Sequence, residues 1–148
     1  MRGSARLAND AWEALLNAHA VLMKRLLDDD IWRDVSMREY DVLYTLFKRS
    51  APIRLGELHR HVLLSQPALS RLVDRLVGRG LVRREPDPSD ARGVLLSLTD
   101  DGRSMQRSVG RRHARSVAAA MAEPLTPDEL AHLEQLCLKL SRDDRRGG

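Results

Sequence analysis

The sequence predicts a mainly α-helical fold with a small β-hairpin wing, in which a winged helix-turn-helix domain is joined to a helical dimerisation region. Three observations predict it. An amphipathic helix over residues 65–80 follows a shorter helical segment through a tight connection. Two short alternating runs come next, separated by a loop rich in Pro and Asp. Long segments near both ends carry apolar residues at helical spacing, which must be covered by a partner surface.

Length, charge and cysteine content limit the classes of protein to which this chain can belong. The chain has 148 residues, which fits one domain, and its formal net charge of +4 is compatible with a polyanionic partner. One cysteine excludes an intrachain disulfide, and no apolar run approaches the roughly 20 residues that cross a bilayer. The N-terminus lacks the apolar stretch of a signal peptide, so we expect a cytoplasmic protein.

The first predicted helix spans residues 5–33. A wide apolar stripe runs along it, formed by Trp12, Leu15, Leu16, His19, Leu22, Met23, Leu26 and Leu27. Its acidic run, Asp28 to Asp30, is unfavourable near a helix C-terminus, because the helix dipole there disfavours negative charge. We therefore expect this helix to fray or bend before Trp32.

A second helix is predicted to begin after Ser36. Ser36 fits the N-cap, and Glu39 stands three residues later, at the capping-box position. The residues that we expect to be buried are Tyr40, Leu43, Tyr44 and Phe47. Ala51 and Pro52 end the helix, and residues 53–55 are long enough only for an edge strand.

The central part of the chain predicts two consecutive helices, over residues 56–62 and 65–80. Pro67 in the first turn and Gly80 after the last turn mark the ends of the second helix. Its apolar face is formed by Leu69, Leu72, Val73 and Leu76. The opposite face carries Arg71, Asp74, Arg75 and Gly78.

A hairpin and two further helices complete the chain. Strands are predicted over 81–85 and 94–99, and we expect the segment PDPSDARG between them to be an exposed loop. Thr99 then caps a helix that runs to about Ala122. After Pro124, a last helix carries a narrow apolar stripe of Leu130, Leu133, Leu136, Cys137 and Leu140. The tail over 142–148 is predicted to be flexible.

The stretch from Leu64 to Arg103, LSQPALSRLVDRLVGRGLVRREPDPSDARGVLLSLTDDGR, resembles the multiple-antibiotic-resistance regulator (MarR) family of winged helix-turn-helix transcriptional regulators. It carries the family's recognition helix, G-L-V at the start of the first wing strand, D-x-R in the wing and L-T-x-x-G at the start of the next helix. The order of the flanking helices also fits, so the resemblance covers nearly the whole chain. His59 departs from the pattern, since the family usually has a small residue there.

The resemblance implies one MarR-type domain over residues 1–148. Its parts are N-terminal helices for dimerisation and packing (5–50), the winged helix-turn-helix (53–99), C-terminal dimerisation helices (100–141) and the flexible tail (142–148). In this family the terminal helices interlock with those of a second subunit, which implies a homodimer; the alternative is that they fold back onto their own domain. Such a dimer is expected to repress transcription from an imperfect palindrome, with recognition helices about 34 Å apart.

Double-stranded DNA is the expected partner, because six arginines gather on one predicted surface: Arg71, Arg75, Arg79, Arg83, Arg84 and Arg92. The start of a recognition helix faces base edges, so the candidate readers are Gln66, Pro67, Ser70 and Arg71. Ser65, at the helix start, is also expected among the DNA-binding residues. Arg75 and Arg79 are expected to hold phosphates. The resemblance further implies that Arg92 enters the minor groove and that Asp90 steadies it.

Other function classes remain as alternatives or are disfavoured. The arginine face alone would also fit a solvated surface, and a winged helix that binds only proteins, without specific DNA binding, stays open. Enzyme chemistry is disfavoured, because the five histidines lack metal-ligand spacing and no phosphate loop or nucleophile motif is present. We therefore expect no catalytic residues, no metal and no cofactor.

A small effector is the last candidate partner. Members of the family often bind phenolic or carboxylate-bearing molecules where the dimer region joins the winged helix. The residues that fit such a site here are Trp12, Leu16, His19, Tyr40, Leu43 and Tyr44, and the alternative is a plain packed core. Cys137 lies on an apolar stripe, where we expect a small buried hydrophobe rather than a redox sensor.

Overall fold

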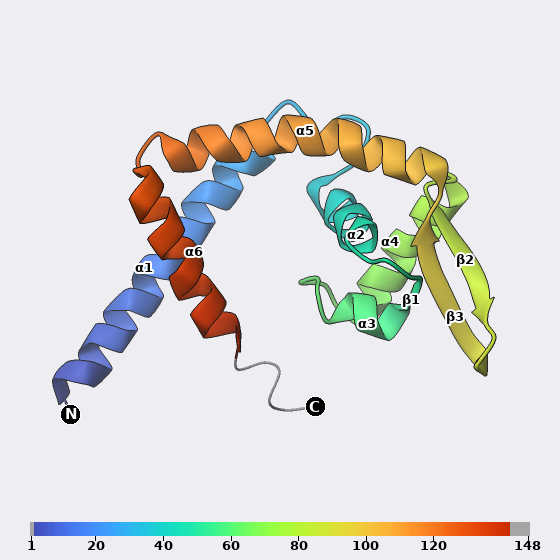
Figure 1. The fold of residues 1–148 in the computed structure, drawn as a ribbon, viewed down its shortest axis with the longest axis horizontal. Coiled ribbons are helices and arrows are strands. Elements are labelled where there is room, and N and C mark those ends of the chain that lie inside the picture. Colours follow the sequence, from blue (N-terminus) through green and yellow to red (C-terminus); the bar gives the residue numbers. More distant parts are fainter. Residues whose placement is uncertain (1, 143–148) are drawn as a thin grey trace. The chain divides into compact units, whose positions relative to one another are not determined.

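The computed structural model describes residues 2–142, and these form six helices and three strands (Figure 1). In chain order the elements are α1 (Arg2–Leu27), α2 (Met37–Phe47), β1 (Ile53–Arg54), α3 (Leu55–His59), α4 (Gln66–Gly78), β2 (Val82–Asp87), β3 (Asp90–Leu98), α5 (Asp100–Ala122) and α6 (Pro127–Ser141). The tail predicted to be flexible, 142–148, lies outside the described residues apart from Arg142, the C-cap of α6.

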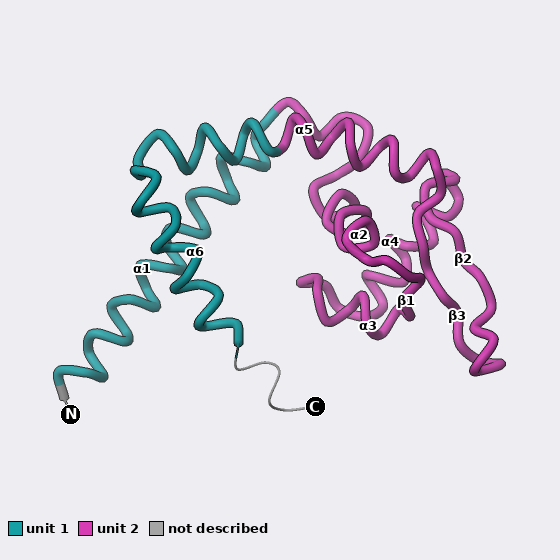
Figure 2. Tube along the Cα trace, in the orientation of Figure 1, with its two compact units in different colours: residues 1–29, 114–148 teal, residues 30–113 magenta. Residues whose placement is uncertain are grey.

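The chain divides into two compact units, which are coloured separately in Figure 2. Residues 30–113 form one of them, here named the winged-helix unit. The described residues before and after this segment form the other, here named the terminal unit, and α5 contributes to both. Among the described residues, no helix is both long and apolar enough to cross a membrane.

The winged-helix unit is built around a three-stranded antiparallel sheet in the order β1-β3-β2. Ile53 of β1 pairs with Leu96, and Val82 of β2 pairs with Leu98, so β3 is the central strand. Helices α2, α3 and α4 contribute to the same core as the sheet, whose completely buried side chains include Val42, Leu43, Leu58, Leu69, Val73, Leu76 and Val109. The predicted fold class, mainly helical with a winged helix-turn-helix, is therefore confirmed.

The recognition helix α4 begins and ends where the sequence indicates. The hydroxyl oxygen of Ser65 accepts a hydrogen bond from the backbone N–H of Ala68 at 3.3 Å, and Pro67 lies in the first turn, where a missing N–H leaves no bond unmade. Beyond the last turn, Gly80 has a φ of 73°, in the left-handed region that favours glycine.

The start of α5 is attached to the end of α4. The Thr99 hydroxyl accepts a hydrogen bond from the Gly102 N–H at 3.0 Å and donates one to the carbonyl oxygen of Gly80 at 2.6 Å. A Cβ at position 102 would lie only 2.0 Å from the Leu81 carbonyl oxygen. The L-T-x-x-G pattern thus supplies both a helix cap and the one residue type that permits this approach.

The capping box predicted for α2 is also confirmed. The Ser36 hydroxyl accepts a hydrogen bond from the Glu39 N–H at 3.1 Å, and the Glu39 carboxylate accepts one from the Ser36 N–H at 2.9 Å. Two backbone donors that an α-helix leaves unpaired at its start are therefore satisfied.

Several predicted bounds were wrong. The first helix ends at Leu27 rather than at 33, since turns begin at the unfavourable acidic run. The helix predicted over 56–62 is α3, which stops at His59 because the residues after it turn toward α4. The segment PDPSDARG is not a loop throughout: β2 and β3 extend into it, only Pro88 and Ser89 lie between them, and Asp87 is buried.

The terminal unit leaves much apolar surface uncovered in the single chain. Arg25 of α1 and Glu123, just after α5, form an ion pair at 3.3 Å, and Ala120 is buried. The large apolar residues of this unit that stay exposed are Leu7, Trp12, Leu15, Leu16, Val21, Leu27, Leu136, Leu138 and Leu140. No residue of α6 is buried, and Cys137 is exposed, so its predicted burial is wrong for one chain.

Candidate nucleic-acid interface

Helix α4 turns a polar face outward because its apolar residues are taken up by the core. Leu69 and Leu76 are completely buried, which leaves the opposite side of the helix accessible. Gln66 and Pro67 in the first turn are exposed, and so is Arg71 one turn later. These side chains carry the donors, acceptors and apolar edge that can contact base edges in a major groove.

Ser70 lies at the junction between α4 and the wing. It is half-buried and lines a groove of about 330 Å³ together with Asp74, Arg84 and Val94, which come from α4, β2 and β3. The groove therefore separates the helix from the two longer strands. The predicted contact of Ser70 with bases stays a prediction.

Three of the six arginines are engaged in ion pairs within the fold. Arg84 pairs with Asp74 of α4, and Arg83 lies 3.8 Å from Glu85 on the same strand. Arg79, the C-cap of α4, lies 3.5 Å from Glu39. The sequence predicted one common surface of six arginines, but the charges of these three are compensated by carboxylates of the same fold.

The other three arginines carry the uncompensated charge. Arg71 and Arg75 on α4 and Arg92 on β3 are exposed, and none of them forms an ion pair within residues 2–142. Unpaired arginines extend into solvent and can neutralise phosphates or address guanine with two donors. Within this set of six, the arginines without an ion pair therefore lie on α4 and on the wing.

The wing turn is closed by Asp90. One oxygen of its carboxylate accepts a hydrogen bond from the backbone N–H of Arg92 at 3.0 Å. The carboxylate therefore contacts the main chain of Arg92, while the Arg92 side chain is exposed. The resemblance implied that Asp90 steadies Arg92, and this role stays a prediction; the bond that the structure shows goes to the Arg92 main chain.

Sequence reasoning missed a buried charged residue next to this turn. Asp87 is 7% exposed, and its carboxylate accepts hydrogen bonds from Ser89 and from Arg54 of β1. The hydrogen bonds from Ser89, followed by that from Arg54, hold the pKa of the Asp87 carboxyl below its usual range. Two Pro residues and a Ser beside Asp87 had indicated a solvated loop, and no local signal pairs it with Arg54, thirty-three positions away.

His59, the departure from the family pattern, has a role in the turn between α3 and α4. Its Nε2–H donates to the carbonyl oxygen of Leu64 at 2.8 Å, and the ring is half-buried. The bond satisfies a carbonyl just before Ser65, the N-cap of α4. A larger side chain at this position therefore supports the turn that leads into the recognition helix.

The residues predicted to form an effector site are placed differently in the two units. In the terminal unit, Trp12, Leu16 and His19 are exposed on α1. In the winged-helix unit, Leu43 is completely buried, as the packed-core alternative describes.

Tyr40 and Tyr44 form part of an aromatic cluster in the winged-helix unit. Their rings stack at a centroid distance of 5.9 Å, and the Tyr40 ring also lies 5.8 Å from Trp32 and 5.2 Å from His113. Burial raises the pKa of the Tyr40 hydroxyl, although its hydrogen bond to Gln106 acts in the opposite direction. Tyr44 is 41% exposed, so of the two tyrosines it is the one accessible from solvent.

The described residues offer no site for a metal ion. Within residues 2–142, no group of three His, Cys, Asp or Glu side chains is arranged to hold one.

The chain is similar to known proteins in both sequence and structure. The family model described as "MarR family" matches residues 35–94. The multiple antibiotic resistance protein MarR of Salmonella typhimurium is 35% identical over 68% of this chain and 74% of that protein.

Solved structures show the same similarity. Sco3205, a MarR family transcriptional regulator from Streptomyces coelicolor in complex with DNA, has a TM-score of 0.77 and 28% identity, covering 91% of this chain and 86% of that one. The PcaV transcriptional regulator from Streptomyces coelicolor, in complex with its natural ligand, has a TM-score of 0.67 and 29% identity, covering 88% of this chain and 89% of that one.

Proposed function

This chain belongs to the MarR family of transcriptional regulators, and from that premise we propose that it is a homodimeric, sequence-specific DNA-binding repressor. The observation that carries the proposal is the distribution of free charge. Arg71, Arg75 and Arg92 are exposed and lack ion pairs within the described residues, whereas other arginines nearby are paired. Because a phosphate backbone attracts uncompensated cations, DNA is the partner that this surface fits best.

Roles for individual residues follow from their position on α4 and the wing. Gln66, Pro67 and Arg71 lie exposed in the first part of α4, which faces base edges when a recognition helix enters a major groove. Ser65 precedes them and Ser70 lies between Pro67 and Arg71. Arg75, one turn beyond Arg71, is assigned to a phosphate. Arg92 is assigned to the minor groove beside the same half-site, with Asp90 holding its main chain.

Dimerisation is supported by the terminal unit. Trp12 and Val21 on α1 and Leu136 and Leu140 on α6 are 57%, 68%, 48% and 71% exposed in the single chain. Apolar area of this extent on two helices is removed from water when a second copy packs against it. The dimer would then present two copies of α4 to successive major grooves about 34 Å apart and bind an imperfect palindrome.

Release from DNA by a small aromatic molecule is the regulatory part of the proposal. PcaV was solved with its natural ligand, so a MarR family structure of similar fold does hold one. In the winged-helix unit, Tyr44 is accessible, and we assign it to contact with a phenolic or carboxylate-bearing effector. An effector releases DNA only if it binds one spacing of the two recognition helices better than the other.

Binding to a pool of random duplexes tests the proposal. Purified full-length protein is incubated with random duplexes of about three helical turns at moderate salt, and bound duplexes are recovered over several rounds and sequenced. We expect the recovered duplexes to share an imperfect palindrome. The proposal also includes that the protein is not an enzyme and that it acts in the cytoplasm. Recovery of unrelated sequences with no enrichment, together with capture of a protein partner, would instead support the protein-interaction alternative.

A further inference from the structure

The tip of the wing is held by a carboxylate with a full set of partners. Oδ1 of Asp87 accepts hydrogen bonds from the Ser89 N–H at 2.9 Å and from the Ser89 hydroxyl at 2.7 Å. Oδ2 accepts one from Nε of Arg54 at 2.7 Å, and another guanidinium nitrogen of Arg54 lies 2.5 Å away. The Asp87 side chain is 6% exposed, so this ion pair differs from the solvated pairs of Arg83 and Glu85 nearby.

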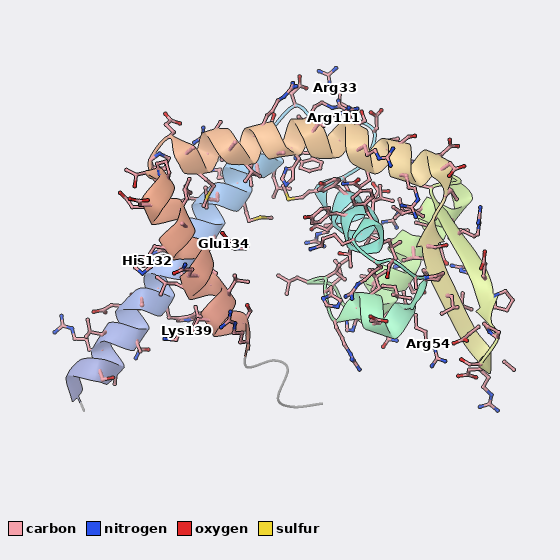
Figure 3. The ribbon with its side chains drawn as sticks, in the orientation of Figure 1. Arg33, Arg54, Arg111, His132, Glu134 and Lys139 are labelled. Carbon is pink, nitrogen blue, oxygen red and sulfur yellow. The ribbon has the colours of Figure 1, made fainter. Side chains whose placement is uncertain are left out.

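The ion pair joins two strands of the winged-helix unit that are not consecutive in the sheet, through residues 33 positions apart in the sequence. Asp87 ends β2, where the pairing with β3 becomes irregular, and Arg54 lies on β1, at the far side of the central strand β3. Figure 3 labels Arg54 beside the hairpin. Arg54 is also the N-cap of α3, the first helix of the helix-turn-helix. The contact between Arg54 and Asp87 thus attaches the hairpin tip to the residue where the helix-turn-helix begins.

Gly93 on the central strand leaves room for this contact. A Cβ at position 93 would lie 3.1 Å from Cβ and 3.3 Å from Oδ2 of Asp87, closer than most side-chain contacts. A side chain there would press against the carboxylate that Arg54 holds. The wing therefore combines the carboxylate of Asp87, the guanidinium of Arg54 from β1, and Gly93, whose lack of a side chain leaves space for their contact.

Arg54 also reaches the residue that holds Arg92. A nitrogen of its guanidinium lies 4.0 Å from the Asp90 carboxylate, whose other oxygen accepts the hydrogen bond from the Arg92 N–H. Arg54 thus faces the two carboxylates that flank the turn of Pro88 and Ser89. One charged side chain on β1 influences the position of the main chain on both sides of the wing tip.

We propose that Arg54 and Asp87 are positioning residues for DNA binding, because they hold the wing, and with it Arg92, at a fixed place relative to α4. The inference rests on the proposed DNA-binding function and adds residues that would touch no nucleotide. A two-stranded hairpin is marginally stable alone, so a free tip would have to be ordered when DNA binds. The contact orders it beforehand, so that α4 and the wing can engage their grooves together.

The variant Asp87→Asn distinguishes a positioning role of Asp87 from a purely electrostatic effect of its charge on DNA affinity. Removing a negative charge near DNA strengthens binding if only electrostatics matters. The positioning role predicts the opposite, since asparagine cannot hold Arg54 in an ion pair and the tip becomes mobile. Glu85→Gln is the matched control, because it removes the same charge from the same strand but leaves the Arg54 contact intact.

The experiment measures the affinity of each full-length variant for the duplex enriched by the selection described above. We expect Asp87→Asn to bind about three- to tenfold more weakly and Glu85→Gln to bind as well as or better than the parent. In an Arg92→Ala background the loss caused by Asp87→Asn should vanish, because a residue that acts through Arg92 has no effect once Arg92 is gone. An equal loss in both backgrounds, or tighter binding by Asp87→Asn, overturns the inference.

A second measurement needs no DNA. Amide hydrogen exchange of Ser89 and Arg92, whose N–H groups bond to Asp87 and Asp90, should be faster in Asp87→Asn than in the parent and unchanged in Glu85→Gln. Unchanged exchange at the tip overturns the inference, and if Asp87→Asn does not fold, Arg54→Gln answers both questions. Failure of the proposed function is seen separately, because the parent then enriches no duplex.

Discussion

The guanidinium of Arg79 donates a hydrogen bond to the carbonyl oxygen of Asp34 at 2.6 Å, which ties the residue after α4 to the segment before α2. The same side chain lies 3.5 Å from Glu39, whose carboxylate also completes the capping box with Ser36. The end of the recognition helix and the start of α2 are therefore held together by one arginine. Helical spacing alone had placed Arg79 with Arg75 as a phosphate contact.

Arg79→Ala should lower the free energy of unfolding by about 1 kcal/mol, because a charge-assisted hydrogen bond and an ion pair at a partly exposed site are lost. Arg75→Ala is the matched control, since Arg75 is exposed and has no ion pair among the described residues. Denaturant unfolding of both variants measures the difference. Equal stability of the two variants would contradict a structural role for Arg79 and leave its assignment to phosphate.

Arg92→Ala should weaken binding to the selected duplex and flatten its salt dependence, because an arginine in the minor groove contributes to counterion release. Asp90→Ala should have the same effect more mildly, through loss of the bond to the Arg92 N–H. Hydroxyl-radical footprints report the minor-groove contact directly. Footprints and affinities identical to the parent, with the protein still folded, would place the wing outside the groove.

The dimer should depend on the exposed leucines of α6. Leu136→Glu places a charge on apolar surface that we propose is buried between subunits, so it should shift the protein toward monomer. Gln135→Glu adds the same charge next to it on an exposed polar position and should leave the assembly unchanged. Sedimentation across a concentration series measures both, and deletion of the chain after Pro124 should dissociate or aggregate the protein. A stable dimer after that deletion would refute the assignment.

Stability should fall in acid partly through Asp87. Its pKa is lowered in the folded chain, so the folded state favours the ionised carboxyl more than the unfolded state does. The resulting stabilisation is present above the ordinary pKa of about 4 and is lost as the pH falls through the lowered value. Thermal unfolding from pH 6 downward should therefore show a weaker acid dependence in Asp87→Asn than in the parent. The same slope in both proteins would mean that another carboxyl governs this range.

Local signals in the sequence were sufficient for most of the winged helix. Ser36 with Glu39, and Ser65 with Pro67, mark helix starts through bonds that span three residues, so their geometry can be foreseen from spacing. The apolar faces of α2 and α4 likewise follow from helical periodicity.

Long-range partners were beyond such reasoning. In the sequence Asp87 has the surroundings of a loop residue, and only the pairing of β1 with β3 brings Arg54 to it. Arg79 likewise has the spacing of a solvated cation, and only the folded chain brings the segment before α2 to it. Cys137 shows a related limit. Its apolar stripe was recognisable, but whether a stripe is covered depends on what packs on it, and among residues 2–142 of the single chain α6 has no fully buried residue.

The central claim is that the unpaired arginines of α4 hold DNA, and the salt dependence of binding tests it most directly. Affinity for the selected duplex is measured across a range of salt concentrations for the parent, for Arg75→Ala and for Arg33→Ala, which removes the same charge from a residue already paired with Asp30. We predict that Arg75→Ala lowers the slope of log affinity against log salt by about 1 for each bound subunit, while Arg33→Ala leaves it unchanged. Identical slopes for all three proteins would contradict the claim.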